Sequence, residues 1–207
     1  MKKLLFLIIV AIITAACTQT PEQKAEAFIK EEVKKTLYKP DTYDPIETKV
    51  DSAYSPYDDP IFYKEFLELI ELGNEYESKE YKIKEAESDM SRYDGSFRMS
   101  YFKYKYKEAK ERYEEGCAEL EKIREKAREK CRGIAPKLQS KPEFVGLKVY
   151  HSYRANTNDG NTVISNYIII VDKEIQNILF VLTLDEYNKY IESVKQLKEK
   201  LKEGELF

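Results

Sequence analysis

Residues 144–184 constrain the fold more than any other stretch, because they have the pattern of three consecutive β-strands. In 145–154 apolar and polar side chains alternate, which is the two-residue period of a half-buried strand. The second run, 163–171, is dominated by Ile and Val, and the third covers 178–184. Clusters of turn-forming residues separate the runs, the first containing Asp-Gly at 159–160. The segment therefore predicts an antiparallel β-meander.

Three flanking segments complete a small α+β domain. Residues 43–53 alternate weakly and carry charges on the outer face, which is typical of an edge strand. Amphipathic helices are predicted after Thr20 and after Thr183, each with a capping-box pattern at its start. Such helices bury their apolar stripes against a sheet. The expected fold is an antiparallel sheet of about four strands, packed by N- and C-terminal helices.

The character of the chain changes between 61 and 134. Apolar residues recur there at a mean spacing of about 3.5, and Asp94-Gly95-Ser96 interrupts the run once. This pattern predicts a long antiparallel helical hairpin, or coiled coil, with arms of roughly 50 Å. It would be inserted between the first and second strands. The expected domains are a signal peptide (1–16), a tether with the first helix and edge strand (17–59), the inserted hairpin (60–136), and the meander with the C-terminal helix (137–207).

The N-terminus has the features of an export signal. Two lysines precede an apolar run, 4–13, which is shorter than the roughly 20 residues that span a bilayer. Thr14-Ala15-Ala16-Cys17 ends it and resembles the lipobox of bacterial lipoproteins, although that family usually has Leu at the position of Thr14. The resemblance implies cleavage before Cys17 and attachment of lipid, including palmitate, to this residue. An ordinary secretory signal followed by an unrelated cysteine is the alternative.

Three segments together resemble small lipoproteins of the Bacteroidetes: the lipobox, residues 37–43 and residues 149–156. The resemblance implies a bacterial cell-envelope location and supplies no catalytic residues. In that group an acidic cluster after the cysteine is associated with surface export, and 18–23 has no such cluster. We therefore expect a lipid-anchored protein of the outer membrane that faces the periplasm.

The remaining cysteines, Cys117 and Cys131, fall on the apolar seam of one predicted helix. At that spacing they lie about 21 Å apart, which is beyond the reach of a disulfide. Small buried thiols are ordinary on such a seam. An intermolecular disulfide in a homodimer is the alternative, and a nucleophile or metal role lacks a neighbouring histidine.

His151 is the only histidine, and the strand pattern places it on the apolar face of its strand. A core histidine that is hydrogen-bonded to a neighbour is therefore predicted. The alternative is a ligand pocket between sheet and helices, lined by His151, Tyr153, Arg154 and Tyr167. No spacing of His and Cys fits a zinc site, so neither a metal nor another cofactor is expected.

Residues 101–107 interleave aromatic and basic side chains, as do surfaces that stack on sugars or bases. The helical seam passes through this stretch, which predicts an aromatic stripe near the hairpin tip. In the alternative interpretation Tyr101, Tyr104 and Lys105 dock on a partner protein or a glycan.

The charge of the chain limits the classes of function that it can have. The chain has a formal net charge of −3, and removing 1–16 takes away two lysines and no acids. This acidity argues against a nucleic-acid partner. Carboxylates are scattered among lysines, as on a solvated helix face. We expect a non-enzymatic, membrane-anchored envelope lipoprotein whose hairpin serves as a protein-interaction or scaffold module with an envelope protein partner. A small-ligand-binding lipoprotein is the alternative, and an enzyme is the third hypothesis. The sequence does not determine the oligomeric state.

Overall fold

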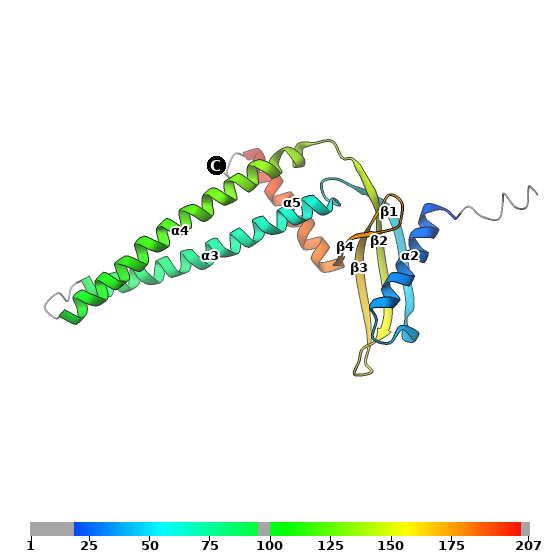
Figure 1. Cartoon of the computed structure of the whole chain (residues 1–207), viewed down its shortest axis with the longest axis horizontal. Coiled ribbons are helices and arrows are strands. Elements are labelled where there is room, and N and C mark those ends of the chain that lie inside the picture. Colours follow the sequence, from blue (N-terminus) through cyan, green and yellow to red (C-terminus); the bar gives the residue numbers. More distant parts are fainter. Residues whose placement is uncertain (1–18, 95–99, 204–207) are drawn as a thin grey trace, which may run out of the picture. The chain divides into compact units, whose positions relative to one another are not determined.

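The computed structural model describes residues 19–94 and 100–203 and confirms an α+β fold. Within them lie a four-stranded antiparallel sheet and four α-helices. The elements in chain order (Figure 1) are α2 (Pro21–Thr36), the 3₁₀ turn η1 (Pro40–Thr42), β1 (Asp44–Tyr54), α3 (Pro60–Asp94), α4 (Ser100–Gln139), β2 (Phe144–Asn156), β3 (Thr162–Asp172), β4 (Ile178–Thr183) and α5 (Leu184–Glu203).

The chain divides into two compact units. The sheet unit contains the residues up to Pro60 together with Pro142–Glu192. The hairpin unit contains Ile61–Lys141 together with the residues from Ser193 onward. Helix α5 therefore contributes to both units, a feature that its sequence pattern does not reveal.

The sheet has the order β1-β2-β3-β4, and every neighbouring pair is antiparallel. Strand β1 forms one edge, as the charges on its outer face predicted. The turn between β2 and β3 contains Gly160 at φ +83°, a conformation that glycine adopts without steric cost. The meander expected from the sequence is thus the centre of the sheet unit.

Each face of the sheet is covered by a different helix. On one face Ala25 and Ile29 of α2 pack with buried residues of β2 and β3, namely Leu147, Val149, Ile169 and Val171. On the other face Leu184 and Tyr187 of α5 pack against Ala53, Ile168 and Ile170. The second half of β3, Ile168–Val171, is apolar on both faces, and this arrangement buries both of them, whereas Val163 and Ile164 at its start are exposed.

Both predicted capping boxes form. The Thr20 hydroxyl accepts a hydrogen bond from the Gln23 backbone N–H, and the Gln23 side chain accepts one from the Thr20 N–H. Thr183 and Glu186 make the same reciprocal pair at the start of α5. These bonds satisfy backbone donors that the first helical turn leaves without partners.

Helices α3 and α4 run antiparallel (Figure 1). Glu65 near the start of α3 pairs with Lys137 near the end of α4, while Asp89 near the end of α3 pairs with Arg112. The seam shifts locally: Glu87, four residues after Ile83, is exposed, and its neighbour Ala86 is buried instead.

Helix α4 is longer than the sequence pattern indicated, because it continues through Pro136 to Gln139. Proline lacks the backbone N–H that would continue the helical ladder. The last turn is held instead by the buried side chain of Leu138 and by Lys137, whose ammonium lies 2.5 Å from the Glu65 carboxylate.

Gly146 lies where β2 approaches the backbone of β3 most closely among the described glycines. A Cβ at this position would lie 1.9 Å from the backbone oxygen of Val171. Since this neighbour is backbone, it cannot move aside without breaking the ladder. We expect Gly146→Ala to lower the free energy of unfolding by about 2–3 kcal/mol in urea titrations of the full chain.

The matched control is Gly133→Ala in α4, where a Cβ would meet nothing within 4 Å. This change should be neutral or stabilise by up to about 1 kcal/mol, because alanine is the better helix former. Equal unfolding curves for Gly146→Ala and the unsubstituted chain would refute the close approach of β2 and β3 at Gly146.

Candidate functional site

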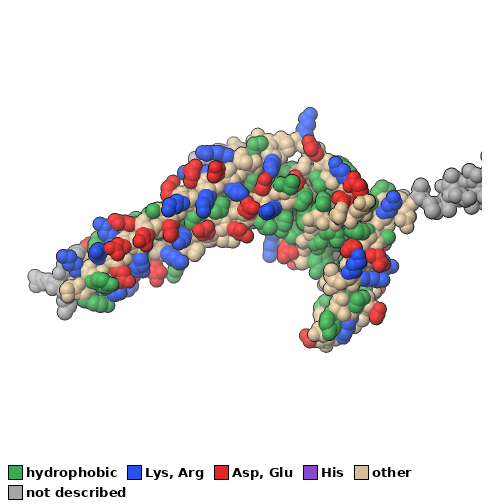
Figure 2. Space-filling view, in the orientation of Figure 1, with side chains coloured by type: hydrophobic (Ala, Val, Ile, Leu, Met, Phe, Trp, Pro, Cys, Tyr) green, Lys and Arg blue, Asp and Glu red, His purple; other side chains and the backbone are tan. Residues whose placement is uncertain are grey.

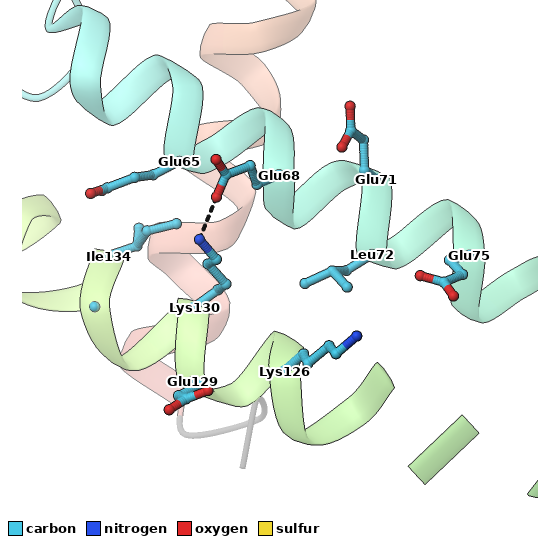
Figure 3. A pocket seen from close by; sticks show the side chains of 10 residues that line it. Glu65, Glu68, Glu71, Leu72, Glu75, Lys126, Glu129, Lys130 and Ile134 are labelled. Atoms are coloured by element: carbon cyan, nitrogen blue, oxygen red, sulfur yellow. Dashed lines mark hydrogen bonds and ion pairs between the residues drawn. The ribbon is translucent and has the colours of Figure 1, made fainter. Parts of the chain in front are cut away.

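The hairpin carries an open groove between α3 and α4, with a volume of about 640 Å³. Figure 3 shows it from close by. Helix α3 contributes one wall and α4 the other. The lining residues are Glu65, Glu68, Glu71, Leu72, Glu75, Lys126, Glu129, Lys130, Gly133 and Ile134.

Gly133 leaves its part of the groove lining without a side chain. A Cβ on Gly133 would meet nothing within 4 Å, whereas one on Gly116 would lie 2.8 Å from Ile83 Cγ1. Gly116 is therefore required for close approach of the two helices, and Gly133 is not. Leu72 and the buried Ile134 give the groove an apolar floor.

The α3 wall of the groove is acidic. Residues 65–78 contain five glutamates and no lysine or arginine. Glu68 pairs with Lys130 across the groove, and this hydrogen bond and charge lower the pKa of the Glu68 carboxyl. Within the described residues, Glu71 and Glu75 belong to no ion pair, and both are exposed. The groove thus presents carboxylates that the hairpin itself does not neutralise.

A second groove of about 690 Å³ lies along the hairpin unit and includes Leu197 and Lys200 of α5. Its charged lining is mainly basic, with Glu77 against Arg124, Arg128 and Lys200. The Arg124 guanidinium lies 5.4 Å from the ring centre of Tyr76 and donates a hydrogen bond to its hydroxyl. Gly73 lines this groove, and a Cβ there would also meet nothing within 4 Å.

The predicted tip residues lie at the start of α4. Tyr101 is 60% exposed and Tyr104 is 64% exposed. The Lys105 ammonium lies 2.8 Å from the Glu108 carboxylate and 5.9 Å from the centre of the Tyr104 ring. Figure 2 shows hydrophobic side chains at the surface near this end of the hairpin. Tyr101 and Tyr104 therefore lie outside the seam, whereas Phe102 is half-buried and its ring centre lies 6.0 Å from that of Tyr93 of α3.

A shallow hollow of about 470 Å³ lies on the same part of α4. It is lined by Ser100, Lys103, Tyr104, Tyr106, Lys107 and Lys110. The hollow combines tyrosine rings with lysine side chains and contains no acid. Its charge is opposite to that of the α3 wall of the groove.

His151 is a core histidine. The Tyr43 hydroxyl is hydrogen-bonded to its Nε2 and the Thr48 hydroxyl to its Nδ1, each at 3.0 Å. Its side chain is buried, and burial lowers the pKa of the imidazole, an effect that Glu26 partly offsets. Both ring nitrogens have a protein partner, so the ring is held by the fold.

Two of the other predicted pocket residues join this cluster. The rings of His151 and Tyr153 are 5.5 Å apart, and those of Tyr153 and Tyr167 are 6.1 Å apart. Arg154 has the opposite orientation, since successive side chains of a strand alternate, and it lies 3.7 Å from Asp44. A cavity of about 270 Å³ adjoins Tyr167, lined by Ile164, Ser165, Asn166, Tyr167, Thr183, Leu184 and Asp185.

Cys17, the predicted lipid-attachment residue, lies outside the described residues. Cys131 is a free thiol whose pKa is raised by burial, and Cys117 is free and partly buried. Among residues 19–94 and 100–203, no group of three or more His, Cys, Asp or Glu side chains could hold a metal ion. No helix in those ranges is long and apolar enough to cross a membrane.

No family model, no curated protein and no solved structure matches the chain. A function must therefore be argued from geometry and charge. The groove is the feature that sequence reasoning missed. Its signal was present in residues 65–78, which have acids and no bases, but the pattern does not tell an open groove from a solvated helix face.

The lowered pKa of His151 predicts how the free energy of unfolding changes with pH. Unfolding returns the imidazole to its ordinary pKa of about 6.5, so the unfolded chain binds a proton that the folded chain does not. The contribution of His151 to stability is complete above this pKa and declines as the pH falls through it. Urea titrations at about pH 7.5 and about pH 5 should show a larger loss for the unsubstituted chain than for His151→Gln. Equal losses would contradict this account.

Proposed function

We propose that this protein is a non-enzymatic, membrane-anchored envelope lipoprotein that binds a protein partner through the groove of its hairpin. The observation that carries the proposal is the groove itself. It is open at Gly133 and apolar at its floor, and one wall carries Glu71 and Glu75, which belong to no ion pair among the described residues. A docked helix would cover the floor and neutralise the wall.

The glycine in the groove supports this proposal on energetic grounds. Glycine inside a helix costs about 1 kcal/mol relative to alanine. Gly116 has a packing reason, because Ile83 occupies the space that a larger side chain would need. Gly133 has no such reason within the described residues, and we attribute its role to the open groove.

We also infer that the hairpin is an insertion in a sheet domain formed by the residues up to Pro60 and by Pro142–Glu192, which is shorter at its end than the expected 137–207. The chain order supports this inference, because α3 and α4 lie between β1 and β2. These two strands pair directly with each other. The sheet domain would be the anchored part, since helix α2 begins at Pro21, a few residues after Cys17.

Small-ligand binding is the second candidate. The cavity beside Tyr167 favours it, because Ser165, Asn166 and Thr183 offer polar groups beside an aromatic ring. Its volume of about 270 Å³ is at the lower end of the range typical of ligand pockets. The hydrogen bonds of His151 to Tyr43 and Thr48 leave the histidine no role in such a pocket.

Lipid attachment can be tested directly. When the full chain is expressed in a bacterium supplied with radiolabelled palmitate, the label should enter the protein and the protein should sediment with membranes. Cys17→Ser removes the sulfur that would carry the diacylglycerol, so this variant should take up no label. Cys117→Ser, which alters a thiol of the hairpin, is the control and should label normally. Label retained by Cys17→Ser would exclude this anchor.

Docking can be tested by filling the groove. We expect chemical cross-linking in native membranes to join the full chain to a defined partner, and Gly133→Leu to abolish this cross-link. A Cβ at Gly133 would meet nothing within 4 Å, so the added side chain would begin in open space. The control is Gly73→Leu, an equal change in the second groove, where a Cβ also meets nothing. A cross-link that survives Gly133→Leu would refute docking in this groove.

A further inference from the structure

We propose that the groove binds the basic, tyrosine-rich start of α4 from a second copy of this chain. The proposal rests on the function proposed above, and it identifies the partner of the same groove. Two surfaces of the hairpin carry it. One is the acidic groove wall, formed by Glu68, Glu71 and Glu75, and the other is the hollow at the start of α4.

The hollow provides three lysines in one stripe, at positions 103, 107 and 110. All three are exposed. Lys107 and Lys110 lie 3.6 Å and 3.7 Å from acids one turn later on the same helix, Glu111 and Glu114. Exposed pairs of this kind contribute little and exchange readily for other partners. Lys103 belongs to no ion pair within the described part of the chain.

The spacing of the two stripes matches. Along α3 the groove glutamates are separated by three and then four residues, and along α4 the lysines are separated by four and then three. Two antiparallel helices would therefore place Glu75 opposite Lys103 and Glu71 opposite Lys107. Glu68, which pairs with Lys130 of its own chain, would lie opposite Lys110. Each stripe spans seven residues, or about 10.5 Å of helix. The charge complementarity is thus a match of register as well as of sign.

Apolar contacts fall in the same register. Tyr104 and Tyr106 line the hollow together with the lysines. In the antiparallel alignment they lie at the level of Leu72, which forms part of the groove floor. Tyrosine suits such a contact, because its ring covers apolar surface while its hydroxyl stays in water.

The lysine stripe in the groove must come from a different molecule, because one chain cannot bring its own stripe into its own groove, and a second copy is the molecule that carries this stripe. On α4, Lys107 lies 23 residues before Lys130, and Lys130 pairs with Glu68 in the groove. This separation corresponds to about 35 Å along a continuous helix. The contact joins two different surfaces, so in a pair of copies one keeps a free stripe and the other keeps a free groove, and each can bind a further neighbour.

The test reverses the charges of the groove wall in one variant and of the lysine stripe in another. One variant carries Glu71→Lys and Glu75→Lys, and the other carries Lys103→Glu and Lys107→Glu. In sedimentation of the full chain in detergent, each variant alone should self-associate about tenfold more weakly than the unsubstituted chain, because like charges oppose. A mixture of the two should recover association, because opposite charges meet again. About 0.5 M salt should weaken association of the unsubstituted chain.

The control variant, Glu85→Lys with Glu87→Lys, changes the net charge equally on the same helix but outside the groove. It should associate like the unsubstituted chain. A loss equal to that of the groove variant would overturn the proposal, since net charge alone would then explain both. Failure of the mixture to associate would overturn it as well.

A zero-length carbodiimide cross-link provides an independent readout. In an equal mixture of ¹⁴N- and ¹⁵N-labelled chain, mixed-isotope peptides should join residues 68–75 to residues 103–110. Cross-links confined to pairs within one chain, such as Glu65 with Lys137, would refute the second copy as partner. If Gly133→Leu still abolished capture of another membrane component, docking in the groove would stand and only this inference would fall.

Discussion

The sheet unit depends on one buried carboxylate, Asp58. This side chain is 3% exposed, and it accepts hydrogen bonds from the Tyr54 backbone N–H at 3.0 Å, the Tyr187 hydroxyl at 2.8 Å and the Lys148 ammonium at 3.3 Å. A charge removed from water is costly unless it is paired and hydrogen-bonded, so the three donors must be in place together. Burial, and then Asp58, raise the pKa of Tyr187, which keeps its hydroxyl a donor. The carboxylate thereby joins the turn after β1 to β2 and to the start of α5.

Local patterns were enough to predict most of the fold. Alternation identified the meander and the edge strand, caps identified the starts of α2 and α5, and heptad spacing identified the two helices of the hairpin. Each of these signals lies within a few residues of sequence. Asp58 carries no such signal, because its partners Lys148 and Tyr187 are distant in sequence. The hydrogen bonds of His151 to Tyr43 and Thr48 were inaccessible for the same reason, although the strand pattern did place the histidine in the core.

The candidate groove shows a further limit of sequence reasoning. Gly116 and Gly133 lie on the same helix and look equivalent in the sequence, yet one contacts Ile83 and the other faces open space. The difference arises because the seam of α4 turns Gly116 toward α3 and Gly133 to the rim, where the helices leave room. Whether a helical glycine allows close packing or opens a groove depends on the neighbouring helix, which the pattern of one helix does not contain.

Polar groups are treated differently in the two units, and this difference points to the hairpin as the functional part. In the sheet unit the buried polar side chains of Asp58 and His151 have partners from several elements, so their chemistry is used to hold the fold. In the hairpin unit Glu71 and Glu75 lie beside apolar floor without ion partners among the described residues. On the function proposed above, their position beside Leu72 and Gly133 would serve a partner that makes both charged and apolar contacts.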